Sequence, residues 1–194
     1  MKGLGYTALL AATVAMAAAS ASAQVQISQD GRPERIFRPI TGLNQNDINF
    51  LRTAAMAHMF EIQSSEIAMD KSSDPFVKEY AKEMIADHQN SLEEMKEIAH
   101  NKGVSLPTDV NWEMKHDLMH LENQTSATLD AAYENAQRSG HANASTLFKA
   151  EIRWGKDEDV RDYAVKTLPV VTMHYKMMLN HNTMMGSTQM KGGS

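Results

Sequence analysis

Hydrophobic positions recur at alternating spacings of three and four along the chain, which is the pattern of amphipathic helices. The first such stretch follows Asn46, the residue expected to cap it, and continues to about Lys71. The second begins at Asp74-Pro75, an N-cap followed by proline at the first helical position, and ends at Gly103. These two stretches predict two long helices joined by a short turn.

A short amphipathic helix is expected next, capped by Thr108 or Asp109 and ending near Glu122. A third long apolar stripe covers residues 126–154. The residues around Gly140, at its centre, have low helix propensity, so a break or bulge there is an alternative. A turn over residues 155–159 leads to the fourth stripe. Pro169 is expected to kink this last helix without ending it, because the stripe stays in phase on both sides.

Four stripes joined by short connections predict an all-α fold, an antiparallel four-helix bundle over residues 46–183 with one short extra helix between long helices two and three. The mixed segment over residues 24–45 is expected to be a flexible lead-in. Residues 184–194, rich in Gly, Ser and Met, are expected to form a disordered tail.

The N-terminus has the features of a secretory signal peptide over residues 1–23. Lys2 precedes an apolar stretch, and Ala21-Ser22-Ala23 is a small-residue cleavage motif, so cleavage is expected before Gln24. A membrane anchor is the alternative, but the stretch is shorter than the roughly 20 residues that a span requires. No later segment is apolar enough to cross a bilayer. We therefore expect an exported or periplasmic protein without a transmembrane span, and association with the outer membrane stays open.

The amino-acid composition limits which partners and which metal ligands are expected. With 194 residues, 42% of them hydrophobic, the chain suits one domain with a real core. It carries 24 acidic against 19 basic residues, a net charge of −5, which argues against binding nucleic acid. It has no cysteine, so disulfides and thiolate metal sites are excluded, and any metal must bind through His, carboxylate or Met.

Histidines interrupt the apolar stripes near the middle of the long helices: His58, His88 and His141, with His174 about one turn beyond the middle of its helix. Midpoints of antiparallel helices meet at one level, so these imidazoles are expected to converge, and Glu61 lies one turn from His58. Buried imidazoles need partners, and a divalent transition metal such as Zn, Fe, Mn or Cu is one partner. The alternative is that each histidine is an ordinary core residue bonded to Asp87 or to a tyrosine among Tyr133, Tyr163 and Tyr175.

Two further patterns carry weaker metal signals. His116 and His120 share one face of the short helix, in the spacing of zinc proteases, but Asp117 stands where those enzymes use glutamate, and a solvated polar face is the better interpretation. The chain also has 15 methionines, many next to histidine. Thioether and imidazole together favour Cu(I), so a copper site is an open hypothesis for the C-terminal residues Met177, His181, Met184 and Met185.

The region from about Asp47 to Met178 resembles the bacterial exported family called domain of unknown function 4142, whose members are often labelled outer-membrane or exported proteins and are placed among ferritin-like folds. The matching pieces are Glu61-Ile62, Ser73 to Lys78, Met84 to His88, Ala99 to Pro107, Leu129-Asp130 with Tyr133, His141 with Phe148, and Leu168-Pro169 with His174. The resemblance implies a ferritin-like bundle in which Glu61, His88, His141 and His174 are the recurring polar residues. His58 departs from the family, which usually has a small residue there, and Gly140 with Asn143 is less helical than the family pattern.

The paired Glu-x-x-His motifs of di-iron ferritins are absent from helices two and four, so ferroxidase chemistry does not follow from the fold. The first hypothesis is a non-enzymatic protein that binds a metal ion or small ligand through Glu61, His88, His141 and His174, with His58 as a fifth ligand. The alternatives are a structural or stress-related envelope protein with hydrogen-bonded histidines, and an oxidoreductase that uses the same site.

Overall fold

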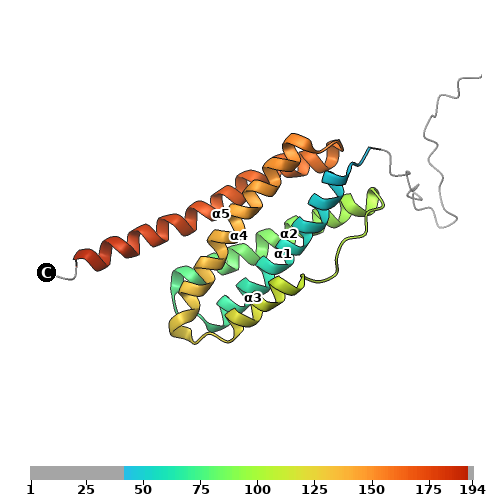
Figure 1. Cartoon of the computed structure of the whole chain (residues 1–194). Helices are drawn as coiled ribbons and strands as arrows, with labels where there is room; N and C mark the ends of the chain where they lie inside the picture. Colours follow the sequence, from blue (N-terminus) through green and yellow to red (C-terminus); the bar gives the residue numbers. More distant parts are fainter. Residues whose placement is uncertain (1–41, 192–194) are drawn as a thin grey trace, which may run out of the picture. The chain divides into compact units, whose positions relative to one another are not determined.

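The computed structural model describes residues 42–191, with side chains as far as His181, and this part of the chain contains helices and no strand. The predicted signal peptide and the predicted lead-in up to Thr41 lie outside the described residues. The helices are α1 (Gln45–Lys71), α2 (Pro75–Asn101), α3 (Trp112–Glu122), α4 (Ser126–Trp154) and α5 (Glu158–Lys191). They form the expected ferritin-like antiparallel four-helix bundle, and the short α3, which follows α2 in the chain, lies beside α1 (Figure 1).

The helix starts depend on local capping, and two of them differ from the prediction. Helix α1 is capped by Asn44, not Asn46, because Asn44 and Asp47 form a reciprocal capping box. Helix α3 is capped by Asn111, whose side chain accepts from the backbone N–H of Met114, and not by Thr108 or Asp109. Asp74 caps α2 as predicted.

The two helices that contain breaking residues are continuous. Helix α4 runs through Gly140 without interruption, and α5 runs through Pro169. Helix α5 also extends to Lys191, beyond Thr183, where the sequence predicted its end and a disordered tail. Met, Gln and Lys in this stretch are good helix formers, and the single Gly186 does not stop the helix.

Two apolar clusters form the core. One gathers Phe50, Leu51, Leu92, Phe148, Val171 and neighbours. The other gathers Ala68, Tyr80, Met84, Tyr133, Met178 and neighbours. A smaller cluster of Phe60, Val110 and Leu118 packs α3 and the segment before it against α1. Each long helix contributes to both main clusters, and the buried histidines lie between the two contributions on every one of them.

The positions of the two apolar clusters explain where the buried histidines, which we call the polar layer, lie along the bundle. On α2, His88 follows Met84 and precedes Leu92, and on α5, His174 lies between Val171 and Met178. The histidines therefore meet where one apolar cluster gives way to the other. Among the described residues, no helix combines the length and apolar character needed to cross a membrane.

Candidate metal centre

Three buried histidines from three helices meet in the polar layer. His88 on α2, His141 on α4 and His174 on α5 each offer a ring nitrogen within 4.8 Å of the others'. Their ring centroids are 5.4 to 5.9 Å apart, and none of the three residues is more than 7% exposed. Ligand nitrogens of one metal ion lie roughly 3 to 4 Å apart, given bonds of about 2.0 to 2.1 Å. Small side-chain rotations would therefore bring the three rings around one ion.

The outer nitrogens of His141 and His174 are bonded to acceptors. His141 Nδ1 lies 2.8 Å from the backbone oxygen of Gln137, and His174 Nε2 lies 3.0 Å from Asp87 Oδ2. A carbonyl and a carboxylate accept, so each of these ring nitrogens carries the proton and donates. The opposite nitrogens, His141 Nε2 and His174 Nδ1, are therefore unprotonated in the neutral rings. Both are buried and have no hydrogen-bond partner among the described residues.

The tautomer of His88 is set through a longer chain of hydrogen bonds. The Tyr163 hydroxyl donates to the Ser91 backbone oxygen at 3.1 Å, so its oxygen accepts from His58 Nε2 at 2.8 Å. The proton of His58 is then on Nε2, and its Nδ1 accepts from His88 Nδ1 at 2.8 Å. His88 Nε2 is left as a bare lone pair, and it too is buried without a hydrogen-bond partner among the described residues.

Burial keeps these rings neutral. Desolvation lowers the pKa of His58 and of His141 to about 4, with smaller contributions from neighbouring histidines. Burial lowers the pKa of His88 well below its usual value, and it lowers the pKa of His174 despite the opposing hydrogen bond to Asp87. At neutral pH the three rings are therefore neutral and each has a lone pair, which is the protonation state that metal ligands require.

Glu61 lies beside the histidines but outside the group of three. Its Oε1 is 4.0 Å from His141 Nδ1, the nitrogen that faces away from the other two rings, and its Oε2 accepts from Gln137 Nε2 at 2.6 Å. Burial raises the pKa of Glu61 to about 8, although the bond from Gln137 opposes this. Glu61 thus faces the outer edge of His141.

The structure brings together three of the five residues that the sequence predicted as ligands: His88, His141 and His174. His58 uses both ring nitrogens in hydrogen bonds to His88 and Tyr163, so it supports the group from outside. His174 also belongs to a second, half-buried group with Glu83 and Asp87 that could hold a cation. Hydrogen-bond partners such as His58 and Asp87 orient metal-binding histidines and set their tautomers.

The weaker sequence signals remain separate from this centre. His116 and His120 are exposed on α3 and belong to no group of three metal-binding side chains in the described part of the chain. Met177 packs against an apolar cluster, and His181 bonds to Glu134 at 3.1 Å. The side chains of Met184 and Met185 lie outside the described residues. The copper hypothesis for the C-terminal residues stays a prediction.

Sequence reasoning missed Gln137, which contacts both His141 and Glu61. A signal was present, because Gln137 precedes His141 by four residues and so lies on the same helix face.

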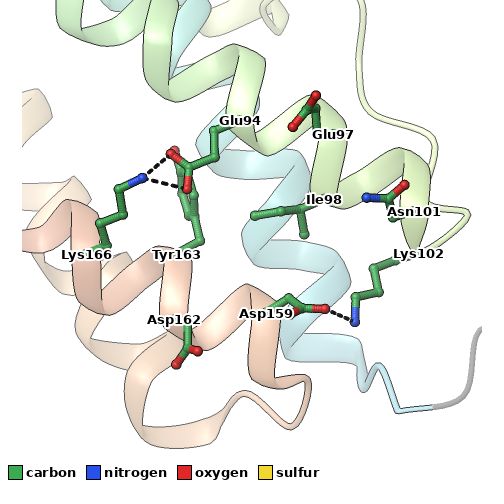
Figure 2. Close-up of a pocket in the computed structure, with 9 residues that line it drawn as sticks. All are labelled: Glu94, Glu97, Ile98, Asn101, Lys102, Asp159, Asp162, Tyr163 and Lys166. Atoms are coloured by element: carbon green, nitrogen blue, oxygen red, sulfur yellow. Dashed lines mark hydrogen bonds and ion pairs between the residues drawn. The ribbon is translucent and has the colours of Figure 1, made fainter.

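A surface hollow of about 530 Å³ lies between α2 and α5 and reaches Tyr163 from outside (Figure 2). Lys166 pairs there with Glu94 at 2.7 Å, and Lys102 pairs with Asp159 at 2.6 Å. The acidic lining of this hollow is thus partly neutralised by two lysines.

The fold and the layer together define an all-α ferritin-like bundle with a buried three-histidine centre. The sequence profile of the family described as "Domain of unknown function (DUF4142)" matches residues 38–180. The chain belongs to this family, as its motifs indicated. A comparison with curated proteins gave no match.

Two solved structures share the fold. A DUF305 fragment from Deinococcus radiodurans aligns with a TM-score of 0.65 at 10% identity, covering 74% of this chain and 97% of that one. A candidate spore coat protein from Bacillus halodurans C-125 aligns with a TM-score of 0.58 at 17% identity, covering 79% of this chain and 94% of that one. At these identities the similarity concerns the fold alone.

Proposed function

We propose that this chain is an exported helical-bundle protein that binds one divalent transition-metal ion through His88, His141 and His174. The observation that carries the proposal is the hydrogen-bond pattern around the three rings. Each ring donates its proton outward, to His58, to the Gln137 backbone and to Asp87 respectively. Each therefore keeps one bare, buried nitrogen, and one ring nitrogen of each residue lies within 4.8 Å of the others'.

Three lone pairs that face one another in an apolar interior repel and have lost the hydrogen bonds of water, a costly arrangement without an electrophile. A metal cation satisfies all three at once. Imidazole donors suit Zn, Cu, Fe and Ni, and Mn is the weakest of the candidate metals for such a set. We expect no catalysis from the ligand set alone.

The competing function is a structural envelope protein whose histidines serve only to bond the helices together. The bonds from His58 to Tyr163 and from His174 to Asp87 favour it, since they are those that a metal-free core would use. The unpartnered nitrogens on the inner side of the rings favour the metal instead.

Elemental analysis distinguishes the two functions. Protein purified without a histidine tag is expected to carry about one metal ion per chain, and a His88→Ala/His174→Ala variant is expected to lose it. A His116→Ala/His120→Ala variant is the matched control, because it removes the same number of histidines from the exposed face of α3. Equal metal content in the two variants, or none in the wild type, would favour the structural function.

Export is tested separately. The mature protein is expected to begin at Gln24, as measured by mass spectrometry of the chain recovered from the periplasm. Recovery of the intact N-terminus from the cytoplasm would contradict it.

A further inference from the structure

A pocket of about 360 Å³ lies between α1, α3 and α4, and we call it the α1/α3/α4 pocket. Small residues form part of its lining, namely Ala57 from α1 and Ala136, Ser139, Gly140 and Ala144 from α4. Glu113 and Asp117, both exposed on α3, also line it. The pocket therefore combines a surface opening with space between two core helices.

The buried carboxyl group of Glu61 is part of the lining of this pocket. Glu61 is only 4% exposed, and its Oε1 lies against Gly140, where an added Cβ would come within 2.7 Å of that oxygen. Gly140 is unfavourable in the middle of a helix. Its absence of a side chain is what admits the Glu61 carboxyl to the space between α1 and α4.

The lining carries charge of one sign. The exposed carboxylates of Glu113 and Asp117 contribute it, the buried Glu61 carboxyl is mostly protonated at neutral pH, and no Lys, Arg or His lines the pocket. The hollow between α2 and α5 differs, since Lys102 and Lys166 line it and pair with two of its four carboxylates. A metal cation in the α1/α3/α4 pocket therefore meets carboxyl groups that no lysine of the lining neutralises.

The pocket also leads toward the histidines. Glu61 Oε1, at its inner wall, is 4.0 Å from the ring of His141, whose other edge faces His88 and His174. His141 is therefore the boundary between the pocket and the three-histidine centre.

We propose that the α1/α3/α4 pocket is the route by which a divalent metal ion reaches the three-histidine centre, with Glu61 as the first ligand that the ion meets inside the protein. The proposal rests on the proposed function, because it assumes an ion at the centre. Glu113 and Asp117 attract the ion at the surface, and Glu61 replaces part of its lost hydration. The His141 ring then has to turn to bind the ion, because its nitrogen next to Glu61, Nδ1, carries a proton and Nε2 holds the free lone pair.

The test is the rate at which full-length metal-free protein binds Co²⁺, followed by stopped-flow absorbance of the cobalt complex. Glu113→Gln/Asp117→Asn is expected to slow binding about fivefold or more, because surface carboxylates raise the association rate of cations. Gly140→Ala is expected to slow it as well, because its Cβ would occupy the space next to Glu61. The final cobalt spectrum should be unchanged in both variants, since neither alters a histidine of the centre.

The matched control is Glu97→Gln/Asp162→Asn, which removes the same charge from the lining of the hollow between α2 and α5. It should bind Co²⁺ at nearly the wild-type rate. Equal Co²⁺-binding rates for Glu113→Gln/Asp117→Asn and Glu97→Gln/Asp162→Asn would overturn the route. Slower binding in Glu83→Gln, with normal rates in the other variants, would also overturn it, because it would place the entrance beside Asp87. If Gly140→Ala does not fold, the comparison between Glu113→Gln/Asp117→Asn and its control variant still tests the route.

Failure of the route and failure of the centre give different results. A normal cobalt spectrum that forms at the same rate in every variant would contradict the route alone. The absence of any cobalt complex in the wild type would contradict the centre and the route together.

Discussion

The Nδ1 atoms of His58 and His88 lie 2.8 Å apart, so one of the two rings must donate to the other. When the Tyr163 hydroxyl donates to the Ser91 carbonyl oxygen, its own oxygen is left to accept from His58 Nε2. Each bond along the path then has one possible direction, and His88 is left with a bare Nε2. A backbone carbonyl about one helical turn from His88 thus sets the tautomer of a candidate metal ligand.

The first prediction concerns these tautomers in the metal-free protein near pH 7. His88 and His141 are expected to be protonated on Nδ1, and His58 and His174 on Nε2. Nitrogen NMR of the imidazole rings measures this directly. The exposed His116 serves as an internal reference for a ring in water. A proton on Nε2 of His88 or His141 would remove the convergent lone pairs and the main support for the metal centre.

The second prediction concerns the support that His58 gives to His88. His58→Ala is expected to weaken metal binding about 10- to 100-fold at unchanged stoichiometry, because the variant frees the His88 ring to change tautomer and orientation. Competition with a chelator of known affinity measures the change. Tyr163→Phe should have a smaller effect in the same direction, since the bond between the two histidines remains. Loss of all metal from His58→Ala would instead identify His58 as a ligand.

The third prediction is the pH dependence of stability without metal. Burial lowers the pKa of His58 and His141 to about 4, so below 6.5 the unfolded chain binds protons that the folded protein excludes, and stability falls toward pH 4. Burial raises the pKa of Glu61 and Glu151 to about 8. Unfolding then releases their protons between about pH 4.5 and 8, so these two groups lower stability as pH rises through that range.

The pKa values of His88 and His174 are lowered as well, so four histidines with lowered pKa values oppose two glutamates with raised ones. Stability should therefore be greatest near pH 6.5. Urea unfolding at several pH values measures it. Glu61→Gln should reduce the loss above pH 6.5 by about half, because Glu151 supplies the remainder. A stability that continues to rise from pH 6.5 to 8 would contradict the raised pKa of both glutamates.

The fourth prediction concerns Gly140 and Glu61 as a pair. In the wild type, Gly140→Ala is expected to destabilise the protein by about 1 to 3 kcal/mol, because the new Cβ would lie 2.7 Å from Glu61 Oε1. In a Glu61→Ala background the same change should stabilise it by about 0.5 to 1 kcal/mol, the usual gain in helix propensity. Urea unfolding of the four proteins measures this coupling. The same sign in both backgrounds would show that the close contact does not decide the residue at position 140.

The fifth prediction concerns Asp47, which joins the start of α1 to the turn before α5. Its Oδ1 accepts from the backbone N–H groups of Lys156 and Asp157 at 2.8 and 3.2 Å, and the residue is fully buried. Asp47→Ala should cost about 2 kcal/mol, because the buried N–H of Asp157 and the partly buried N–H of Lys156 lose their acceptor. Asp70→Ala, on the exposed face of the same helix, is the control and should change stability by less than about 0.5 kcal/mol.

The amino-acid sequence by itself determined where most helices lie and which residues reach the polar layer. Asp74-Pro75 and Gly103 bound α2 through local backbone chemistry, which operates within a few residues and so is visible in sequence. His88, His141 and His174 could be predicted together because a 3.6-residue period and antiparallel packing place mid-helix positions at one level. The capping of α1 and α3 was less predictable, since several Asn, Asp and Thr residues near each start could serve as the cap.

Only the tertiary structure decided which of the five candidates face one another. The rotation of each helix about its axis is set by side chains packed from its neighbours, so sequence spacing placed Glu61 and His58 at the right level but could not say that they lie behind His141 and His88. The same holds for the ring nitrogens, whose protons depend on Ser91, Gln137 and Asp87 across the bundle. Gly140, which weakens a helix when read locally, makes room for a carboxyl group from another helix, and this reason exists only in three dimensions.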